Sequence, residues 1–190
     1  SAGLNNAILN VGKIRNSGVE VEINWADSKG GFDYNIGMNF STTKNKVVEL
    51  ADKGQVLYGE GLKYGTEHFP TQTRVGKPIG AFYLYKTNGL FQSNEEARQY
   101  VNADGDEYQP FADAGDIRYV DVNGDGYIDD DDKVYCGSGI PTLEVNLNFS
   151  AGYKGFDLSV VLGSAWGHKI YNGNKYFYEG MNSGSNFLTS

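Results

Sequence analysis

The chain has few of the residues on which most metal and catalytic sites depend. Its 190 residues include one cysteine, Cys136, and two histidines, His68 and His168. A single cysteine excludes an internal disulfide and a thiolate metal cluster. Neither histidine has a nucleophile or ligand partner at an informative spacing, and P-loop and dinucleotide-binding motifs are missing. We therefore expect no enzymatic activity.

Positive charge, proline and long apolar runs are also scarce. The chain carries 16 Lys and Arg against 24 Asp and Glu, a formal net charge of −8, and this balance argues against nucleic acid as a partner. The sequence has no run of about 18 apolar residues, so it predicts no transmembrane helix. Only four prolines stand beside 26 glycines, 14 tyrosines and ten phenylalanines, which favours strands joined by glycine turns.

Four segments alternate strictly between apolar and polar residues: 18–25, 32–41, 143–151 and 156–163. Such alternation predicts β-strands with one apolar and one polar face. Short glycine-containing stretches at 26–31 and 152–155 predict two tight hairpins. With their flanks, the strands are expected at about 11–25, 32–42, 143–152 and 155–167.

The two hairpins are separated by a long excursion at about 43–142 of irregular, glycine- and tyrosine-rich sequence. Residues 94–101 within it predict a short helix. Alternation between very short and very long connections is typical of outer-membrane β-barrels, and strands of this length suit a tilted bilayer crossing. A soluble β-sandwich would produce the same alternation, so both architectures stay open at this point.

The stretch DVNGDGYIDDDD, residues 121–132, matches the offsets of an EF-hand cation loop. Gly126 falls at the sharp turn and Ile128 at the inward-packing position. Oxygen ligands at these offsets suit Ca²⁺ better than Mg²⁺, which needs tighter octahedral spacing. The expected structural Ca²⁺ ligands are Asp121, Asn123, Asp125, the carbonyl of Tyr127, Asp129 and Asp132.

Other features of the excursion have structural interpretations that involve no ligand. The alternative interpretation of residues 121–132 is a solvated acidic turn that binds no cation. The flank at 115–120 alternates like a strand, so we expect a structural cation loop without the usual pair of helices. Asp104, Asp106 and Glu107 fit no full cation template, and an exposed loop is the favoured interpretation. The aromatic clusters at 81–91 and 171–180 are expected to serve loop packing or a barrel girdle rather than sugar stacking.

Three passages resemble one protein family in order and spacing. They are NVGKIRNSGVEVEINW at 10–25, GKPIGAFYLYKTNGLFQSNEEARQY at 76–100, and the segment 114–172 that contains the acidic loop and the hairpin after it. The family is the SusC/RagA-like group of TonB-dependent outer-membrane transporters of Bacteroidetes. The resemblance covers about residues 10–178 and implies that residues 1–190 are a single fragment from the C-terminal part of the β-barrel.

The resemblance also implies a function for the full protein. It would import glycans or peptides across the outer membrane, with a SusD-like surface lipoprotein and TonB as partners, oligosaccharide or peptide as substrate, and lipid around the barrel. The excursion at about 43–142 would then be extracellular. The alternative is a soluble, secreted, Ca²⁺-stabilised β-module that binds carbohydrate or mediates adhesion.

Overall fold

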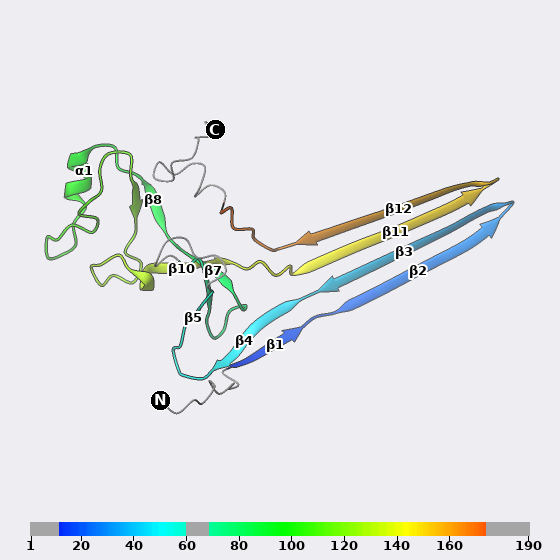
Figure 1. Ribbon diagram of the computed structural model, residues 1–190, viewed down its shortest axis with the longest axis horizontal. Coiled ribbons are helices and arrows are strands. Elements are labelled where there is room, and N and C mark those ends of the chain that lie inside the picture. The colour runs from blue at the N-terminus through cyan, green and yellow to red at the C-terminus, as the bar shows by residue number, and fades with distance from the viewer. Residues whose placement is uncertain (1–11, 60–68, 174–190) are drawn as a thin grey trace, which may run out of the picture. The chain divides into compact units, whose positions relative to one another are not determined.

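The computed structural model describes residues 12–59 and 69–173, which form two compact units. The first unit comprises residues 1–81 and 137–190, and the second comprises residues 82–136. Antiparallel strands dominate the first unit, as Figure 1 shows, and the mainly β fold predicted from the alternation is confirmed. His68 and most of the aromatic cluster at 171–180 lie outside the described residues.

A four-stranded antiparallel sheet is the main element of the first unit. Its strand order is β12-β11-β3-β2, and its long strands run side by side in Figure 1. The neighbours β3 and β11 are separated by about a hundred residues of sequence, so the excursion leaves and re-enters the sheet between adjacent strands. The four strands are β2 (Glu20–Lys29), β3 (Phe32–Thr42), β11 (Leu143–Tyr153) and β12 (Phe156–Trp166).

Two-residue turns close both hairpins of this sheet. Gly30 and Gly31 join β2 to β3 with φ of +63° and +79°, and Lys154 and Gly155 join β11 to β12 with φ of +49° and +84°. Positive φ at both central residues is the geometry of a type I′ turn, which matches the twist of paired strands. The sheet therefore extends to Lys29, four residues beyond the predicted end of the first strand.

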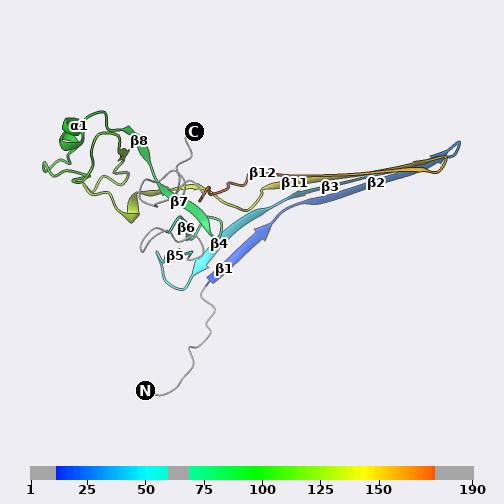
Figure 2. The same ribbon diagram turned by 45° about the horizontal axis from the view of Figure 1, so that its top comes forward.

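The strand predicted at 11–25 is interrupted at Gly18. The structure instead has β1 (Gly12–Ser17) paired with β4 (Lys44–Leu50), and this pair continues from the β2/β3 hairpin at an angle, as Figure 2 shows. A Cβ atom at Gly18 would lie 1.8 Å from the carbonyl oxygen of Thr42, so the chains approach too closely there for a side chain. Antiparallel pairing therefore continues to Leu50, inside the segment predicted as the excursion.

The turn at residues 74–77 packs against β4. Val47 is fully buried and Leu50 nearly so. The backbone of Val47 exchanges hydrogen bonds with Lys77 and Gly76 at 2.9 and 2.8 Å, which holds the turn after β6 against β4. The short strands are β5 (Leu57–Tyr58) and β6 (Thr71–Thr73), which pair with each other.

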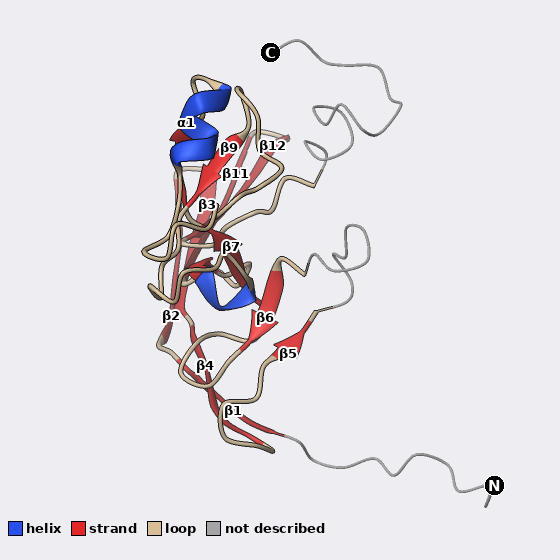
Figure 3. Cartoon of the chain, turned by 90° about the vertical axis from the view of Figure 1, so that its left-hand side faces the viewer, coloured by secondary structure: helices blue, strands red, loops and turns tan. Residues whose placement is uncertain are grey.

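The second unit is built from short elements around a small core of Phe91, Ala97 and Ala112, with Tyr100 packed against it. Strand β8 pairs with β9, and β10 lies beside β7. Figure 3 marks the helical turns of this unit in blue. The elements are β7 (Ala81–Tyr85), β8 (Thr87–Leu90), α1 (Asn94–Gln99), β9 (Ile117–Tyr119), a 3₁₀ helix (Asp130–Asp132) and β10 (Lys133–Gly137).

The short helix predicted at 94–101 is confirmed as α1. The Ser93 hydroxyl accepts the Glu96 N–H at 3.2 Å, and the Glu96 carboxylate accepts the Gln92 N–H at 2.7 Å, so both ends of a capping pair lie at the start of the helix. The helix ends at Gln99 because Tyr100 leaves helical geometry, with ψ of 83°. Within residues 12–59 and 69–173, no helix has the length and apolar character needed to cross a membrane.

Candidate functional site

The four-stranded sheet has one apolar and one polar face. Cross-strand register places residues from all four strands in rows across the sheet, and three central rows of the apolar face are almost wholly apolar. Polar residues form the rows between them. The apolar rows are Trp25–Ile36–Phe149–Val160, Ile23–Met38–Leu147–Leu162 and Val21–Phe40–Val145–Ser164.

The apolar face is open. Ile23, Trp25 and Leu162 keep 53%, 60% and 57% of their surface exposed, although side chains of this kind are normally buried. An exposed apolar surface that runs across four strands indicates a face that contacts another protein or a membrane.

The height of the apolar face matches a bilayer. From Phe32 to Thr42, β3 rises about 34 Å at about 3.4 Å per residue. With the tilt of about 45° that is usual for barrel strands, this gives about 24 Å along the membrane normal, close to the apolar band of about 25 Å in outer-membrane barrels. Phe32, Tyr153 and Phe156 form an aromatic row at the hairpin end, where a barrel has its aromatic girdle.

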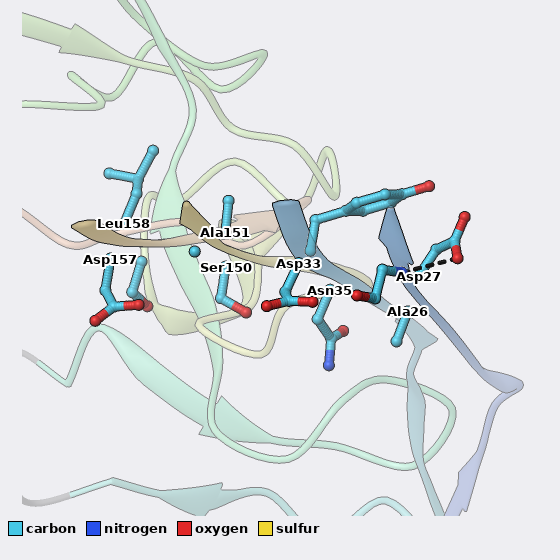
Figure 4. A pocket seen from close by; sticks show the side chains of 12 residues that line it. Ala26, Asp27, Asp33, Asn35, Ser150, Ala151, Asp157 and Leu158 are labelled. Carbon is cyan, nitrogen blue, oxygen red and sulfur yellow. Dashed lines mark hydrogen bonds between the residues drawn. The ribbon is translucent and has the colours of Figure 1, made fainter. Parts of the chain in front are cut away.

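The opposite face is mainly polar, with Val161 as its one large apolar side chain. At the hairpin end of the sheet, side chains of both faces border an open hollow of about 840 Å³. Figure 4 shows Asp33, Ser150 and Asp157 pointing to one side of the sheet there, while Ala151 and Leu158 point to the other. Each strand thus presents alternate residues to two different environments, as the walls of a water-filled barrel do.

The acidic loop folds around its own backbone amides. Asp121 accepts hydrogen bonds from the N–H groups of Gly124 and Gly126 at 2.6 and 2.9 Å. Asn123 Oδ1 accepts the Asp125 N–H at 2.9 Å, and Asp125 Oδ1 accepts the Tyr127 N–H at the same distance. Successive ligand positions of the template therefore form linked turns.

The last predicted ligand closes the loop end to end. Asp132 is fully buried, and its Oδ1 accepts the N–H groups of Val122 at 2.7 Å and Asn123 at 3.3 Å. Its Oδ2 accepts the Asp129 N–H at 2.9 Å, and the Asp129 side chain in turn accepts the Asp131 N–H. Asp129 is the N-cap of the 3₁₀ helix, so the exit helix of an EF-hand is reduced here to one turn.

Tyrosines surround the loop and shape its electrostatics. Desolvation opposes ionisation of Asp121, but the N–H groups of Gly126 and Gly124 and the Tyr108 hydroxyl outweigh it, so the pKa of Asp121 lies below its usual value. Burial, followed by the charge of Asp130 and a hydrogen bond to it, raises the pKa of Tyr85 to about 12.

The hydrogen bonds are compatible with a cation. A carboxylate offers about four lone-pair sites, so an oxygen that accepts one N–H can still ligate. Asp121 and Asp132 each accept three hydrogen bonds and Asp125 accepts two, so each carboxylate keeps at least one free lone-pair site. Across the described residues, no three His, Cys, Asp or Glu side chains converge in a ready metal-binding group.

Asn102 is a residue that sequence reasoning missed. Its Oδ1 accepts the N–H groups of Asp104 and Asp106 at 3.0 and 2.9 Å, and its Nδ2 donates to the Gly126 carbonyl at 3.0 Å. The 102–106 turn is therefore organised by an asparagine and docks on the acidic loop at its sharp turn. The signal available in the sequence was the turn-forming spacing Asn-x-Asp-Gly-Asp.

The fold and the two-faced sheet define a class of protein: a β-structure of the outer-membrane barrel type. The structure of this chain is similar to two solved structures, that of the RagAB peptide transporter and that of the RagAB peptide importer in its closed-closed state. Each comparison has a TM-score of 0.60 and 18% sequence identity. The match covers 90% and 92% of this chain, and 17% and 18% of those chains, and it concerns the fold.

Sequence comparison reaches a particular group. The chain is 27% identical to TonB-dependent receptor P3 and 30% identical to TonB-dependent receptor P26, both of Formosa agariphila, over 172 and 184 residues. These matches cover 90% and 94% of this chain but only 17% and 18% of the receptors. No protein-family profile matches. The chain is a homologue of SusC/RagA-like TonB-dependent receptors and spans about a sixth of their length.

Proposed function

We propose that the chain is part of the C-terminal barrel wall of an outer-membrane TonB-dependent transporter that takes up nutrients. The observation that carries this proposal is the single-layer sheet with apolar rows across four membrane-length strands. The apolar face would contact lipid, the polar face would line the lumen, and the edge strands β2 and β12 would pair with further barrel strands.

The position of the excursion supports an extracellular assignment for residues 43–142. In outer-membrane barrels the two-residue turns lie on the periplasmic side and the long connections outside. Both type I′ turns lie at one end of the sheet, and the excursion leaves from the other end. On this assignment the acidic loop and α1 lie outside the cell.

The relatives support a proposal for the substrate and partners. The relatives are TonB-dependent receptors, and the RagAB structures are described as those of a peptide transporter and importer. We infer import of glycans or peptides, driven through TonB and assisted by a SusD-like surface lipoprotein. A soluble β-sandwich module is disfavoured, because such a module would cover the apolar face with a second sheet, and in the described part of the chain this face is open.

A matched pair of substitutions tests the membrane placement in the full receptor. Leu162 and Val161 are adjacent on β12, point to opposite faces, and are 57% and 72% exposed. Leu162→Arg would place a charge in lipid near the bilayer midplane at a cost of about 2–4 kcal/mol, whereas Val161→Arg would face water.

We expect Leu162→Arg to reduce the amount of folded receptor in the outer membrane, while Val161→Arg assembles normally. Transport is then measured by growth. Receptor-deficient cells that express each variant are grown on a panel of oligosaccharides and peptides. Equal assembly of both variants would reject the lipid-facing assignment. If deletion of the receptor reduces growth on none of the substrates in the panel, import of those nutrients is rejected.

We also propose that the acidic loop binds Ca²⁺ as a structural brace. Asp121, Asn123, Asp125, the Tyr127 carbonyl and Asp129 would supply oxygen ligands, with Asp132 closing the loop, and an extracellular affinity of about 10⁻⁴–10⁻³ M would fit. EDTA should then increase proteolysis of the loop in the receptor, and Asp125→Ala should abolish that sensitivity. Asp104→Ala, an exposed carboxylate outside the loop, should keep it. No effect of EDTA on the parent would leave the loop an acidic turn.

A further inference from the structure

The polar face of the four-stranded sheet has a one-sided charge. Its twenty positions form five rows of four residues, and they include five carboxylates, five asparagines and no Lys, Arg or His. The rows are Glu20–Ser41–Glu144–Ala165, Glu22–Asn39–Asn146–Gly163, Asn24–Gly37–Asn148–Val161, Ala26–Asn35–Ser150–Ser159 and Ser28–Asp33–Gly152–Asp157.

The basic residues of these hairpins do not neutralise this face. Lys29 falls in the register of the apolar face, beside Phe32. Lys154 lies in a turn, and its ammonium sits 5.1 Å over the ring of Tyr153, which also belongs to the apolar face. Two of the three polar-face glutamates have amide partners: Asn24 donates to Glu22 at 2.8 Å and Asn39 to Glu20 at 3.3 Å.

The carboxylates are close enough to act together. Strands are about 4.8 Å apart, so Asp33 and Asp157, which flank Gly152 on neighbouring strands, stand about 10 Å apart. Glu20 and Glu22 are about 7 Å apart along β2. These separations are comparable to the Debye length of about 8 Å at physiological ionic strength, so a small ion beside the sheet feels several charges at once.

We infer that this wall of the lumen excludes anions, so that the solutes moving along it are neutral or cationic. The inference rests on the proposed transport function and narrows its substrate class. Neutral oligosaccharides and neutral or basic peptides can use the asparagine and serine side chains as hydrogen-bond partners. Sulfated or uronate-rich glycans and acidic peptides would instead meet uncompensated negative charge at both ends of the sheet.

Charge-selective thiol labelling of the full receptor tests the inference. In a receptor whose native cysteines, Cys136 included, are replaced by serine, Ser150→Cys and Ser159→Cys each place a thiol beside the row that carries Asp33 and Asp157. Each is treated with a cationic trimethylammonium and an anionic sulfonate methanethiosulfonate reagent. Rates are divided by those of a small free thiol, which removes the intrinsic difference between the reagents.

The expected ratio follows from Coulomb's law. At the Ser150→Cys thiol, two carboxylates about 8 Å away, in water with screening, favour the cationic reagent over the anionic one about four-fold at 0.15 M salt and about fifteen-fold at 0.01 M. Replacing both carboxylates, by Asp33→Asn with Asp157→Asn, should bring the ratio close to one. Asp104→Asn in the second unit should leave it unchanged. If the double variant does not assemble, Asn35→Lys in the Ser150 row should lower the ratio in the same way.

A ratio near one at both thiols, or a ratio that the neutralising variants do not change, overturns the inference. Absence of reaction at both thiols overturns it too, because solutes then do not reach this face. A thiol on the apolar face, Leu147→Cys, tests the proposed function separately. If it reacts as fast as Ser150→Cys, the membrane placement fails even where the charge preference at Ser150 is observed.

Discussion

Removing the Asp132 carboxylate should open the acidic loop. Asp132 is fully buried and accepts three backbone N–H groups, from Val122 and Asn123 at the start of the loop and from Asp129 near its end. In Asp132→Ala these donors lose their acceptor, and the alanine side chain offers no replacement. The loop must then admit water or separate its two ends.

The magnitude follows from the three hydrogen bonds. Bonds to a charged acceptor contribute about 1.5–3 kcal/mol each, and the bond from Asn123, at 3.3 Å, is the weakest of the three. Relief of the buried charge offsets part of the loss. We expect the free energy of local opening to fall by about 3–4 kcal/mol, which is about a 10²–10³-fold rise in the open population at 1.4 kcal/mol per factor of ten.

Hydrogen exchange measured by mass spectrometry on the full receptor reads this change directly. Peptides that cover residues 121–132 should exchange about 10²–10³-fold faster in Asp132→Ala, while peptides from β3 and β11 stay unchanged. Asp131→Ala, the removal of an adjacent exposed carboxylate, is the matched control and should leave exchange as in the parent. Equal exchange in Asp132→Ala and the parent would show that the buried carboxylate does not hold the loop closed.

Two further predictions concern the hairpin junction and the pH response of the loop. Gly18→Ala should reduce the yield of folded receptor in the outer membrane, because its Cβ would lie 1.8 Å from the Thr42 carbonyl oxygen. The control Gly139→Ala should fold normally, because the nearest atom to its Cβ would be 3.9 Å away. Equal yields of the two variants would refute the steric reasoning. Because the pKa of Asp121 is lowered on folding, its stabilisation is complete above the ordinary value of 3.8 and is lost as the pH falls through the folded pKa. Pepsin cleavage of the loop, normalised to a peptide substrate, should therefore rise below about pH 4, and Asp121→Asn should flatten this rise; an unchanged pH profile in that variant would contradict the assignment.

The alternation of the sequence predicted the sheet because each strand has two different environments. Strands β3, β11 and β12 lie within a residue or two of their predicted bounds. The break at Gly18 could not be predicted, because it depends on contact with Thr42, which is 24 residues away. Strand β4 was missed because its sequence, KNKVVEL, does not alternate between apolar and polar residues, and its strand conformation depends on pairing with β1.

The acidic loop was predictable in its offsets but not in its packing. Template spacing identified Asp121 and Asp132 as the two ends of one loop. It gave no sign that Asp132 is fully buried or that Tyr108 donates a hydrogen bond to Asp121. The docking of Asn102 on Gly126 joins two turns 24 residues apart, and local sequence carries no information on such a contact.

The adjacency of β3 and β11 makes the excursion separable from the wall that carries it. Its ends meet where the Thr43 N–H donates to the Thr142 carbonyl at 3.1 Å, so the circumference of the sheet does not depend on what lies between them. Doubling the length of such a connection costs only about 0.6 kcal/mol of closure entropy. On the extracellular assignment proposed above, a different domain grafted at this junction would change recognition at the cell surface without redesign of the four-stranded sheet.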